Sequence, residues 1–192
     1  MGKAYAGRRA DRPEGDFYAT PYLLVDKLYD VFLKDLTRET RILECASGDG
    51  AISGRLREMG FTNVTEHDIR TDGVDFLTFN DGGFDVIITN PPFSLFDEFV
   101  LHAKRLGVRR FVFLGKTNFF GSHSRTVNRI FDNLESVWVF DRQIAYNHER
   151  REDGKAPCGC LVTGWFMWNM DWRKKWAKIS VIDIDDCIVR RK

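Results

Sequence analysis

The sequence is short of cysteine and lacks a long apolar run, and each shortage excludes a class of protein. Its four cysteines, among 192 residues, form neither a CxxC pair nor the framework of a disulfide-rich secreted domain. No stretch is long and apolar enough for a transmembrane helix, and no signal-peptide pattern is present. We therefore expect free thiols in a soluble, cytoplasmic protein with no membrane partner.

Metal-ligating patterns are missing as well. Cys158 and Cys160 are one residue too close for the Pro-Cys-x-x-Cys zinc pattern of deaminases, and His148-Glu149 lacks the intervening residue that this pattern requires. The other histidines are scattered along the chain. We expect no structural metal.

The net charge is small, at +1, but the charges are segregated. Residues 61–100 carry eight acids and one Arg, whereas residues 101–130 carry seven Lys or Arg and no acid. This asymmetry is compatible with a polyanion-binding face and equally with ordinary solvated helices. With 43% hydrophobic residues, the chain has enough apolar material for one core. We expect a flexible basic arm at 1–16 and a single domain at 17–192.

The most informative stretch reads GGFDVIITNPPFSLF, at residues 82–96. Its FDVIIT segment is β-branched and apolar, which is typical of a strand buried on both faces of a parallel sheet. Two prolines end the strand, because proline has no N–H to donate to a sheet. The turn that follows brings together Asn90, Pro91, Pro92 and Phe93.

This turn is suited to activating a conjugated amine, whose nitrogen lone pair is delocalised. The Asn90 side-chain oxygen and a carbonyl near Pro91 could each accept one N–H and draw the nitrogen toward tetrahedral geometry. Phe93 would stack on the ring that carries the amine. The alternative is a plain strand with a proline turn, which the aromatic residue and the preceding strand disfavour. Asn-Pro-Pro-Phe after FDVIIT resembles the catalytic motif of S-adenosylmethionine-dependent amino-methyltransferases.

A second motif lies ahead of this turn, in FYATPYLLVDKLYDVFLKDL. Thr20 is placed as a helix N-cap and Pro21 as the first helical residue, and the apolar residues that follow repeat at helical spacing. Tyr18, Thr20 and Pro21 also resemble the motif that lines the methionine end of the cofactor in adenine-specific DNA methyltransferases.

The segment RILECASGDGAISGRLREMG predicts a strand, a small-residue loop and a helix. Gly48 and Gly50 allow close approach of a ligand, and Glu44 can accept hydrogen bonds from an ammonium group. A dinucleotide loop would need a third glycine where Ser53 stands. The segment resembles instead the first methyltransferase motif, with Cys45 replacing the usual proline. The cofactor contacts that this resemblance implies are Glu44, Ala46, Ser47, Gly48 and Gly50.

Two acids further along complete the cofactor motifs. Asp68 follows the next predicted strand, eighteen residues after Gly50. Rossmann-like folds place a ribose-binding carboxylate at about this spacing, and Glu66 is the alternative. In the resembled family, an acid at the position of Asp75 contacts the adenine amino group, and the next apolar residue, Phe76, packs on the ring.

Together these motifs resemble the EcoRI-type adenine methylases and small phage enzymes over about residues 17–168. The resemblance implies a Rossmann-like class I methyltransferase fold, with a mostly parallel seven-stranded sheet and helices on both faces. It implies S-adenosyl-L-methionine as cofactor and methyl transfer to the N6 amine of flipped adenine in DNA, in a bacterial or phage-infected cell. An RNA base amine, a protein glutamine amide and a non-catalytic nucleic-acid-binding subunit remain alternatives.

Recognition of DNA would fall to two loops, 116–129 and 141–159, because the chain is too compact for a separate recognition domain. The candidate DNA contacts in these loops are Lys116, Arg125, Arg129, Arg142, Arg150 and Arg151. Five aromatic residues near the end of the chain could form a stacking platform for bases, although such a strand more often fills a core. They are Trp165, Phe166, Trp168, Trp172 and Trp176.

Overall fold

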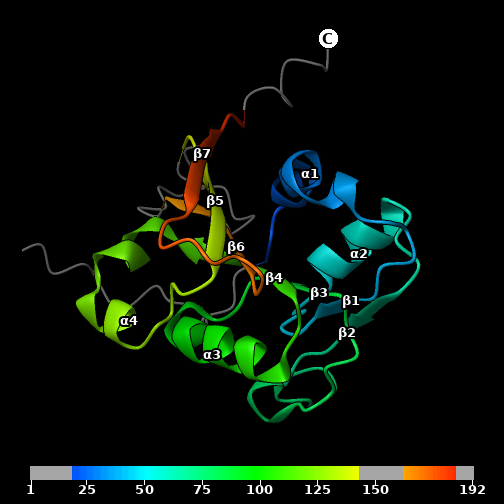
Figure 1. The fold of residues 1–192 in the computed structure, drawn as a ribbon. Helices are drawn as coiled ribbons and strands as arrows, with labels where there is room; N and C mark the ends of the chain where they lie inside the picture. Colours follow the sequence, from blue (N-terminus) through cyan, green and yellow to red (C-terminus); the bar gives the residue numbers. More distant parts are fainter. Residues whose placement is uncertain (1–18, 143–161, 185–192) are drawn as a thin grey trace, which may run out of the picture.

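The computed structural model describes residues 19–142 and 162–184, which form a seven-stranded sheet with helices on both faces (Figure 1). The strand order is β2-β1-β3-β4-β6-β5-β7. β6 runs antiparallel to both of its neighbours, and every other pairing is parallel. The strands are β1 (Ile42–Glu44), β2 (Val64–Glu66), β3 (Val86–Thr89), β4 (Arg110–Lys116), β5 (Leu134–Phe140), β6 (Thr163–Asn169) and β7 (Lys178–Ile182). The predicted sheet is therefore confirmed, whereas the arm at 1–16 and most of the loop at 141–159 lie outside the described residues.

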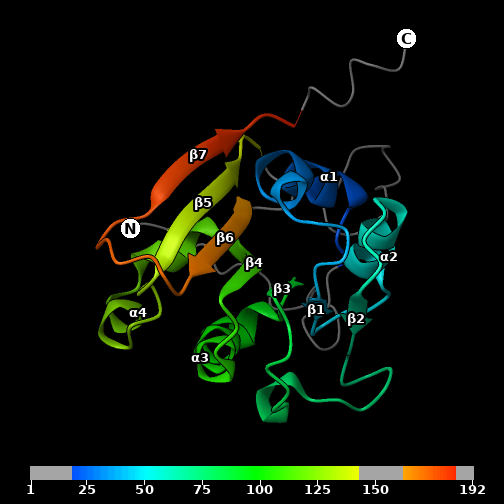
Figure 2. The same cartoon turned by 45° about the vertical axis from the view of Figure 1, so that its right-hand side comes forward.

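The helices form two layers, one on each face of the sheet (Figure 2). The first layer holds α1 (Tyr22–Val31) and α2 (Ala51–Glu58). The second holds α3 (Phe96–Leu106), with α4 (His123–Val127) beside it. The short 3-10 helices are η3 (Leu33–Asp35), η4 (Phe76–Thr78), η5 (Phe93–Leu95) and η6 (Thr117–Gly121). Across the described segments, no helix is both long enough and apolar enough to cross a membrane.

The central strands divide their side chains between these two layers. In β4, Val112 and Leu114 join the core under α1 and α2, while Phe111 and Phe113 join the core under α3. This alternation follows from the two-residue period of a strand, and it requires apolar residues at every position. The same rule buries Trp165, Phe166 and Trp168 of β6 completely, so for these three the core interpretation is confirmed.

Two predicted helix boundaries are wrong. Thr20 does not cap α1, because Pro21 occupies the N-cap position and no side chain bonds there. The sequence also predicts a helix from Arg125 to Asn133, whereas α4 begins at His123 and ends at Val127, and both Arg129 and Asn133 adopt positive φ angles. Apolar residues continue at helical spacing beyond Val127, but the backbone turns toward β5 there and the helix ends.

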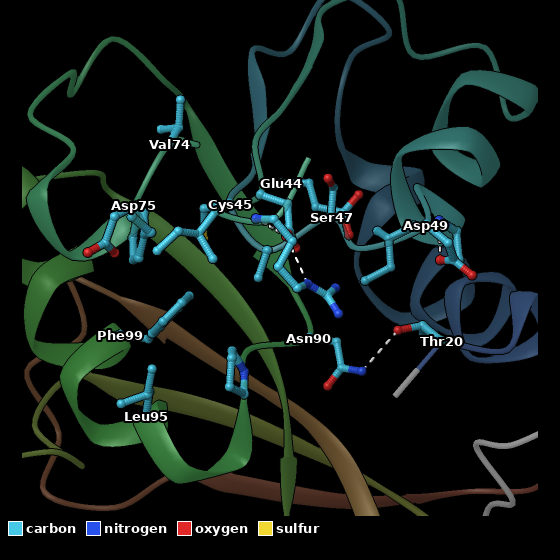
Figure 3. Close-up of a pocket in the computed structure, with 18 of the residues that line it drawn as sticks. Thr20, Glu44, Cys45, Ser47, Asp49, Val74, Asp75, Asn90, Leu95 and Phe99 are labelled. Carbon is cyan, nitrogen blue, oxygen red and sulfur yellow. Dashed lines mark hydrogen bonds and ion pairs between the residues drawn. The ribbon is translucent and has the colours of Figure 1, made fainter. Parts of the chain in front are cut away.

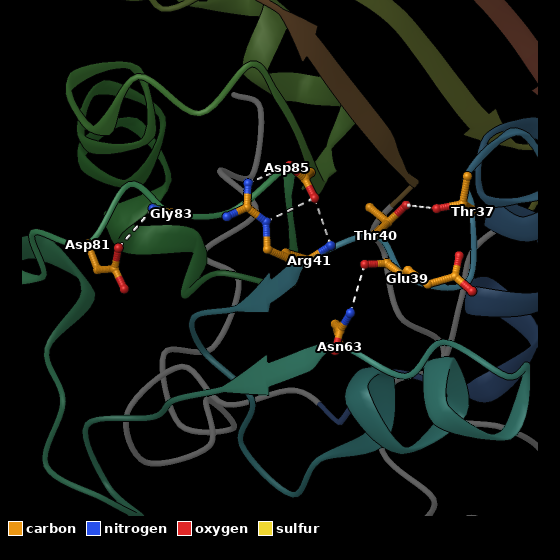
Figure 4. Close-up of polar contacts among 8 residues, drawn as sticks. All are labelled: Thr37, Glu39, Thr40, Arg41, Asn63, Asp81, Gly83 and Asp85. Atoms are coloured by element: carbon orange, nitrogen blue, oxygen red, sulfur yellow. Dashed lines mark hydrogen bonds and ion pairs between the residues drawn. The ribbon is translucent and has the colours of Figure 1, made fainter.

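Polar contacts align the strands at the edge of the sheet where β1 and β3 begin (Figure 4). The Asp85 carboxylate accepts hydrogen bonds from the Arg41 backbone N–H at 2.9 Å and from the Arg41 guanidinium Nη2 at 2.9 Å. On the other side of β1, Asn63 Nδ2 donates to the Glu39 carbonyl at 2.8 Å, just before β2. These bonds help align the starts of β1, β2 and β3, so that the carboxyl ends of the three strands meet at the opposite edge of the sheet.

Gly164 marks a place where the sheet has no room for a side chain. A Cβ there would lie 2.5 Å from the Trp138 carbonyl oxygen and 3.0 Å from the Val139 Cα, and both are backbone atoms of β5. Gly164→Ala should therefore lower the free energy of unfolding by about 1 to 3 kcal/mol, as overpacking does elsewhere. The control is Gly54→Ala in α2, where a Cβ meets nothing within 4 Å and helix propensity should add roughly 0.5 to 1 kcal/mol. Equal urea midpoints for the two variants would refute this account.

Candidate active site

The site lies where the chain changes direction across the sheet. β1 connects through α2 to β2 on one side, whereas its other neighbour, β3, connects through α3 to β4, so the connections after β1 and β3 leave the sheet in opposite directions. Open α/β sheets bind ligands in the crevice at such a point. A cavity of about 640 Å³ lies here, lined by residues that follow β1, β2 and β3 and by residues of α3 and the segment before α1. Its volume is within the range of roughly 300 to 1,000 Å³ that is typical of ligand sites.

Most residues predicted for the site are brought together in this cavity. Those that line it are Thr20, Glu44, Ala46, Ser47, Asp68, Asp75, Phe76, Asn90 and Pro92. Those described but not lining it are Pro21, Gly48, Gly50, Pro91 and Phe93, whereas Tyr18 lies outside the described residues. Gly48 still acts on the site indirectly, because its N–H donates to the Asp68 carboxylate at 2.9 Å.

The cavity has an apolar end and a polar end (Figure 3). Asp75, Leu95 and Phe99 lie at one end, and Thr20 and Asp49 lie at the other. Glu44, Cys45 and Ser47 lie between them. The arrangement suits an elongated ligand with a ring at one end and polar groups at the other.

Sequence reasoning missed most of the apolar lining. Ile69 lines the cavity with 60% of its surface exposed, and its place next to Asp68, the predicted ribose acid, was a usable signal. Among the other apolar lining residues that were not predicted are Val74, Leu77, Leu95 and Phe99. Their local sequence does not show that they face the cavity, and tertiary folding brings them together.

Glu44 is a buried acid at the centre of the cavity wall. Only 1% of its surface is exposed, and its Oε2 accepts the Ser53 N–H, in the first turn of α2, at 2.7 Å. Burial raises the pKa of Glu44 to about 8, and the hydrogen bonds from Ser53 offset only part of this effect. The carboxyl group is therefore mostly protonated near neutral pH and can ionise when a cation binds beside it.

Asp68 lines the cavity, and Glu66 does not. Burial by itself would raise the pKa of Asp68, but hydrogen bonds from Arg70 and Gly48 and the charge of Arg70 outweigh it, and the pKa falls below its ordinary value. Asp68 is therefore ionised at neutral pH. The Glu66 side chain turns toward α2, where it bonds the Ser53 hydroxyl and pairs with Arg57 at 3.1 Å.

The Asn90 amide is oriented by a distant residue. Its Nδ2 donates a hydrogen bond to Thr20 Oγ1 at 3.1 Å, and Thr20 is 6% exposed (Figure 3). Since the amide nitrogen points toward the segment before α1, the amide oxygen occupies the opposite side of the planar group. Thr20 thus selects which end of the amide is presented as an acceptor.

Phe93 is placed differently from its predicted role. Its ring is 6% exposed and lies outside the cavity, with the Lys116 Nζ 4.3 Å from the ring centroid and Phe119 packed at 6.3 Å. Stacking on a base would require this ring to leave its position. Lys116, expected on a DNA-contacting loop, lies beside the catalytic turn.

The other predicted DNA contacts differ in exposure. The Arg125 side chain is 20% exposed, pairs with Asp97 at 2.6 Å and lies over the Phe119 ring. The Arg129 side chain is 81% exposed and pairs with Asp132, and Arg142 pairs with Asp141. Arg150 and Arg151 lie outside the described residues.

Comparison with solved structures identifies the fold. A type I restriction-modification methyltransferase subunit from Streptococcus thermophilus superposes with a TM-score of 0.60 at 13% identity, over 86% of this chain and 47% of that one. A protein from Listeria monocytogenes described as a class I S-adenosylmethionine-dependent methyltransferase gives 0.56 at 14% identity, over 85% and 65%. This chain has the class I methyltransferase fold.

The neighbours also include a tRNA methyltransferase. A tRNA (uracil-54, C5)-methyltransferase from Pyrococcus abyssi, solved with S-adenosyl-L-homocysteine, gives a TM-score of 0.51 at 18% identity, over 79% of this chain and 40% of that one. The chain spans about half the length of the Streptococcus subunit. No family model and no curated protein matches the chain.

The pKa of Glu44 predicts a pH dependence of stability. Because the folded state raises this pKa from 4.5 to about 8, its stabilising contribution is complete below 4.5 and is lost as pH rises toward 8. The slope should reach about 1.4 kcal/mol per pH unit at most. Glu44→Gln should flatten urea-derived unfolding free energies between about pH 5 and 8. The control is Glu66→Gln, since the lowered pKa of Glu66 places its titration below this window, and an unchanged slope in Glu44→Gln would contradict the assignment.

Proposed function

We propose that this chain is an S-adenosylmethionine-dependent methyltransferase that modifies the N6 amine of adenine in DNA. The observation that carries the proposal is Asn90, which follows β3 at the wall of the cavity with its amide oriented by Thr20. An oriented hydrogen-bond acceptor at this position would hold a substrate amine and align it for methyl transfer.

The chemistry of the cavity fits the cofactor, which carries a positive sulfonium and an ammonium group. Four acids line the cavity, Glu44, Asp49, Asp68 and Asp75, and the cation among the described lining residues is Arg70. Excess negative charge favours a cationic ligand. When bound, the cofactor would supply an electrophilic methyl group.

Each end of the cavity has a role in holding this ligand. Leu95 and Phe99 offer apolar contact to the adenine ring, beside the Asp75 carboxylate as an acceptor for its amino group. Asp68 can accept hydrogen bonds from ribose hydroxyls in addition to those from Gly48 and Arg70. Glu44 lies between the two ends, where the ammonium group would stabilise its ionised form.

Asn90 would act on the substrate amine by position and hydrogen bonding. Its amide oxygen accepts one N–H, and a neighbouring carbonyl of the proline turn accepts the other, so that the nitrogen lone pair is aligned with the methyl group. Thr20 is the positioning residue, because it holds the amide nitrogen away from the substrate. In duplex DNA the adenine must first leave the base stack.

Adenine is favoured by the identity of residue 90. The resembled enzymes that act on cytosine N4 more usually have Ser or Thr at this position, whereas those that act on adenine N6 have Asn. The similarity to a type I restriction-modification subunit also supports DNA. Among the candidate DNA contacts, Arg129 and Arg142 are the most exposed described residues, and Arg125 would contribute by supporting Phe119.

A labelling experiment tests the proposal directly. The protein is incubated with tritiated S-adenosylmethionine and, separately, DNA, RNA and protein extract, and labelled DNA is digested for nucleoside analysis. We expect tritium in N6-methyl-2′-deoxyadenosine from DNA. Label in an RNA nucleoside or in glutamine would replace the substrate assignment, and no label in any arm would overturn the enzymatic proposal.

Asn90→Ala should lower the methylation rate by roughly 10²- to 10³-fold, as loss of one transition-state hydrogen bond does elsewhere. Cofactor affinity should remain nearly normal, because the lost acceptor acts on the substrate amine. Thr20→Val should lower kcat less severely, and Thr20→Ser should restore it by returning the hydroxyl. Near-normal turnover by Asn90→Ala, or equal rates for the two Thr20 variants, would contradict these roles.

Asp68→Asn should weaken cofactor binding by about 1.5 to 3 kcal/mol, the value of one hydrogen bond to a charged group. Calorimetric titration with S-adenosylmethionine measures the change, and Glu66→Gln serves as the matched control outside the cavity. Normal affinity in Asp68→Asn together with weakened affinity in Glu66→Gln would reassign the ribose contact to Glu66.

A further inference from the structure

A second cavity, of about 870 Å³, shares no lining residue with the first. It is lined by residues at the start of β5 and β7, in the turn after β6 and around α4. Phe120, which also lines it, follows Phe119, whose ring centroid lies 6.3 Å from that of Phe93 in the catalytic turn. The cavity therefore begins close to the catalytic turn and extends toward the edge of the sheet where β5 and β7 begin.

This cavity, the tryptophan groove, combines exposed aromatic rings with positive charge. Its aromatic members are Phe120, Phe131, Trp172 and Trp176. Trp176 is 56% exposed and Phe120 is 41% exposed, in contrast to the buried tryptophans of β6. The described charged residues that line it are four cations, Arg129, Arg173, Lys174 and Lys175, and one acid, Asp132, which pairs with Arg129.

The groove is held in shape by its own contacts. Trp172 Nε1 donates to the Trp176 carbonyl at 3.0 Å, and the Trp172 carbonyl accepts from Asn133 Nδ2 at 2.9 Å. The two indoles stand perpendicular, with centroids 5.6 Å apart. Lys174 Nζ lies 4.6 Å from the Trp176 ring centroid. The exposed Trp176 is thus fixed in place without being buried, which is unfavourable for a residue with only a structural role.

We propose that the tryptophan groove binds an unpaired segment of nucleic-acid strand. Trp176, which is 56% exposed, can stack on a base of any identity, and Arg173, Lys174 and Lys175 can contact the phosphates. Phe120 packs on Phe131 and Phe166, with ring centroids 5.3 Å apart in each pair, and adds exposed apolar surface to the groove. Bases within a duplex are already stacked on one another, so the rings select single strands. The combination of ring faces and excess positive charge favours a nucleic acid over an acidic protein segment, which would gain little from stacking.

The proposal rests on the proposed function in one respect: it takes the bound strand to be part of the DNA substrate. Asn90 lines the first cavity and not the groove, so the groove would not hold the base that is modified. It would hold a flanking part of the same strand and so lengthen its residence on the enzyme. Binding itself needs no catalysis.

The test is fluorescence anisotropy with a labelled oligothymidine of about 12 nucleotides, a length within known single-strand site sizes. Thymine has no amino group to methylate, so binding is measured apart from methylation. Trp176→Ala should weaken binding roughly 5- to 150-fold, the factor expected for one stacked base. Trp176→Phe should restore most of the affinity, because a stacking face returns.

Charge is tested with Lys175→Gln, which should weaken binding and reduce the salt slope by about one. Lys34→Gln, at an exposed position of η3, is the charge-matched control and should change neither. Equal binding of duplex and single strand with no effect of Trp176→Ala would overturn the proposal, as would equal competition by polyglutamate.

The outcomes also separate the two proposals. If no methyl label is transferred while Trp176-dependent binding persists, the proposed function fails alone. If methylation is intact but binding ignores Trp176, the groove proposal fails alone.

Discussion

The structure depends on the pairing of β3 with one side of β1 while β2 pairs with the other. These strands are short, and β1 and β3 are buried at every position, so pairing is stabilised by burial on both faces. The Arg41–Asp85 contacts hold the starts of β1 and β3 level. Because the strands are parallel, their carboxyl ends share one edge, and Glu44 and Asn90 reach the same cavity from different strands.

In the folded structure, the charges that are segregated along the sequence form local ion pairs and line an acidic cavity. Asp97 of the acidic stretch pairs with Arg125 of the basic stretch, and Asp85 pairs with Arg41. Asp68 and Asp75 line the cavity. The acidic and basic stretches therefore supply ion pairs between elements and a cavity suited to a cation. They do not by themselves define a polyanion-binding face.

The aromatic residues fall into two groups with different physical roles. Trp165 and Trp168 are fully buried, and each indole N–H donates to a backbone carbonyl, of Leu24 and Ile130 respectively, at 2.9 Å. Each indole N–H therefore has a hydrogen-bond acceptor within the core. Trp172 and Trp176 lie past the end of β6, where Trp176 is 56% exposed and positive charge gathers around both rings.

The sequence by itself determined the strand-and-turn units, the class of fold and most of the cavity-lining polar residues, because these follow from local periodicity and from motifs within short segments. Tertiary structure alone decided the partner of Asn90, seventy residues away at Thr20, and the burial of Phe93 beside Lys116. It also decided which tryptophans are core and which line a groove. The physical reason is that burial and hydrogen-bond partners across the fold depend on which elements pack together, and local sequence patterns do not encode that choice.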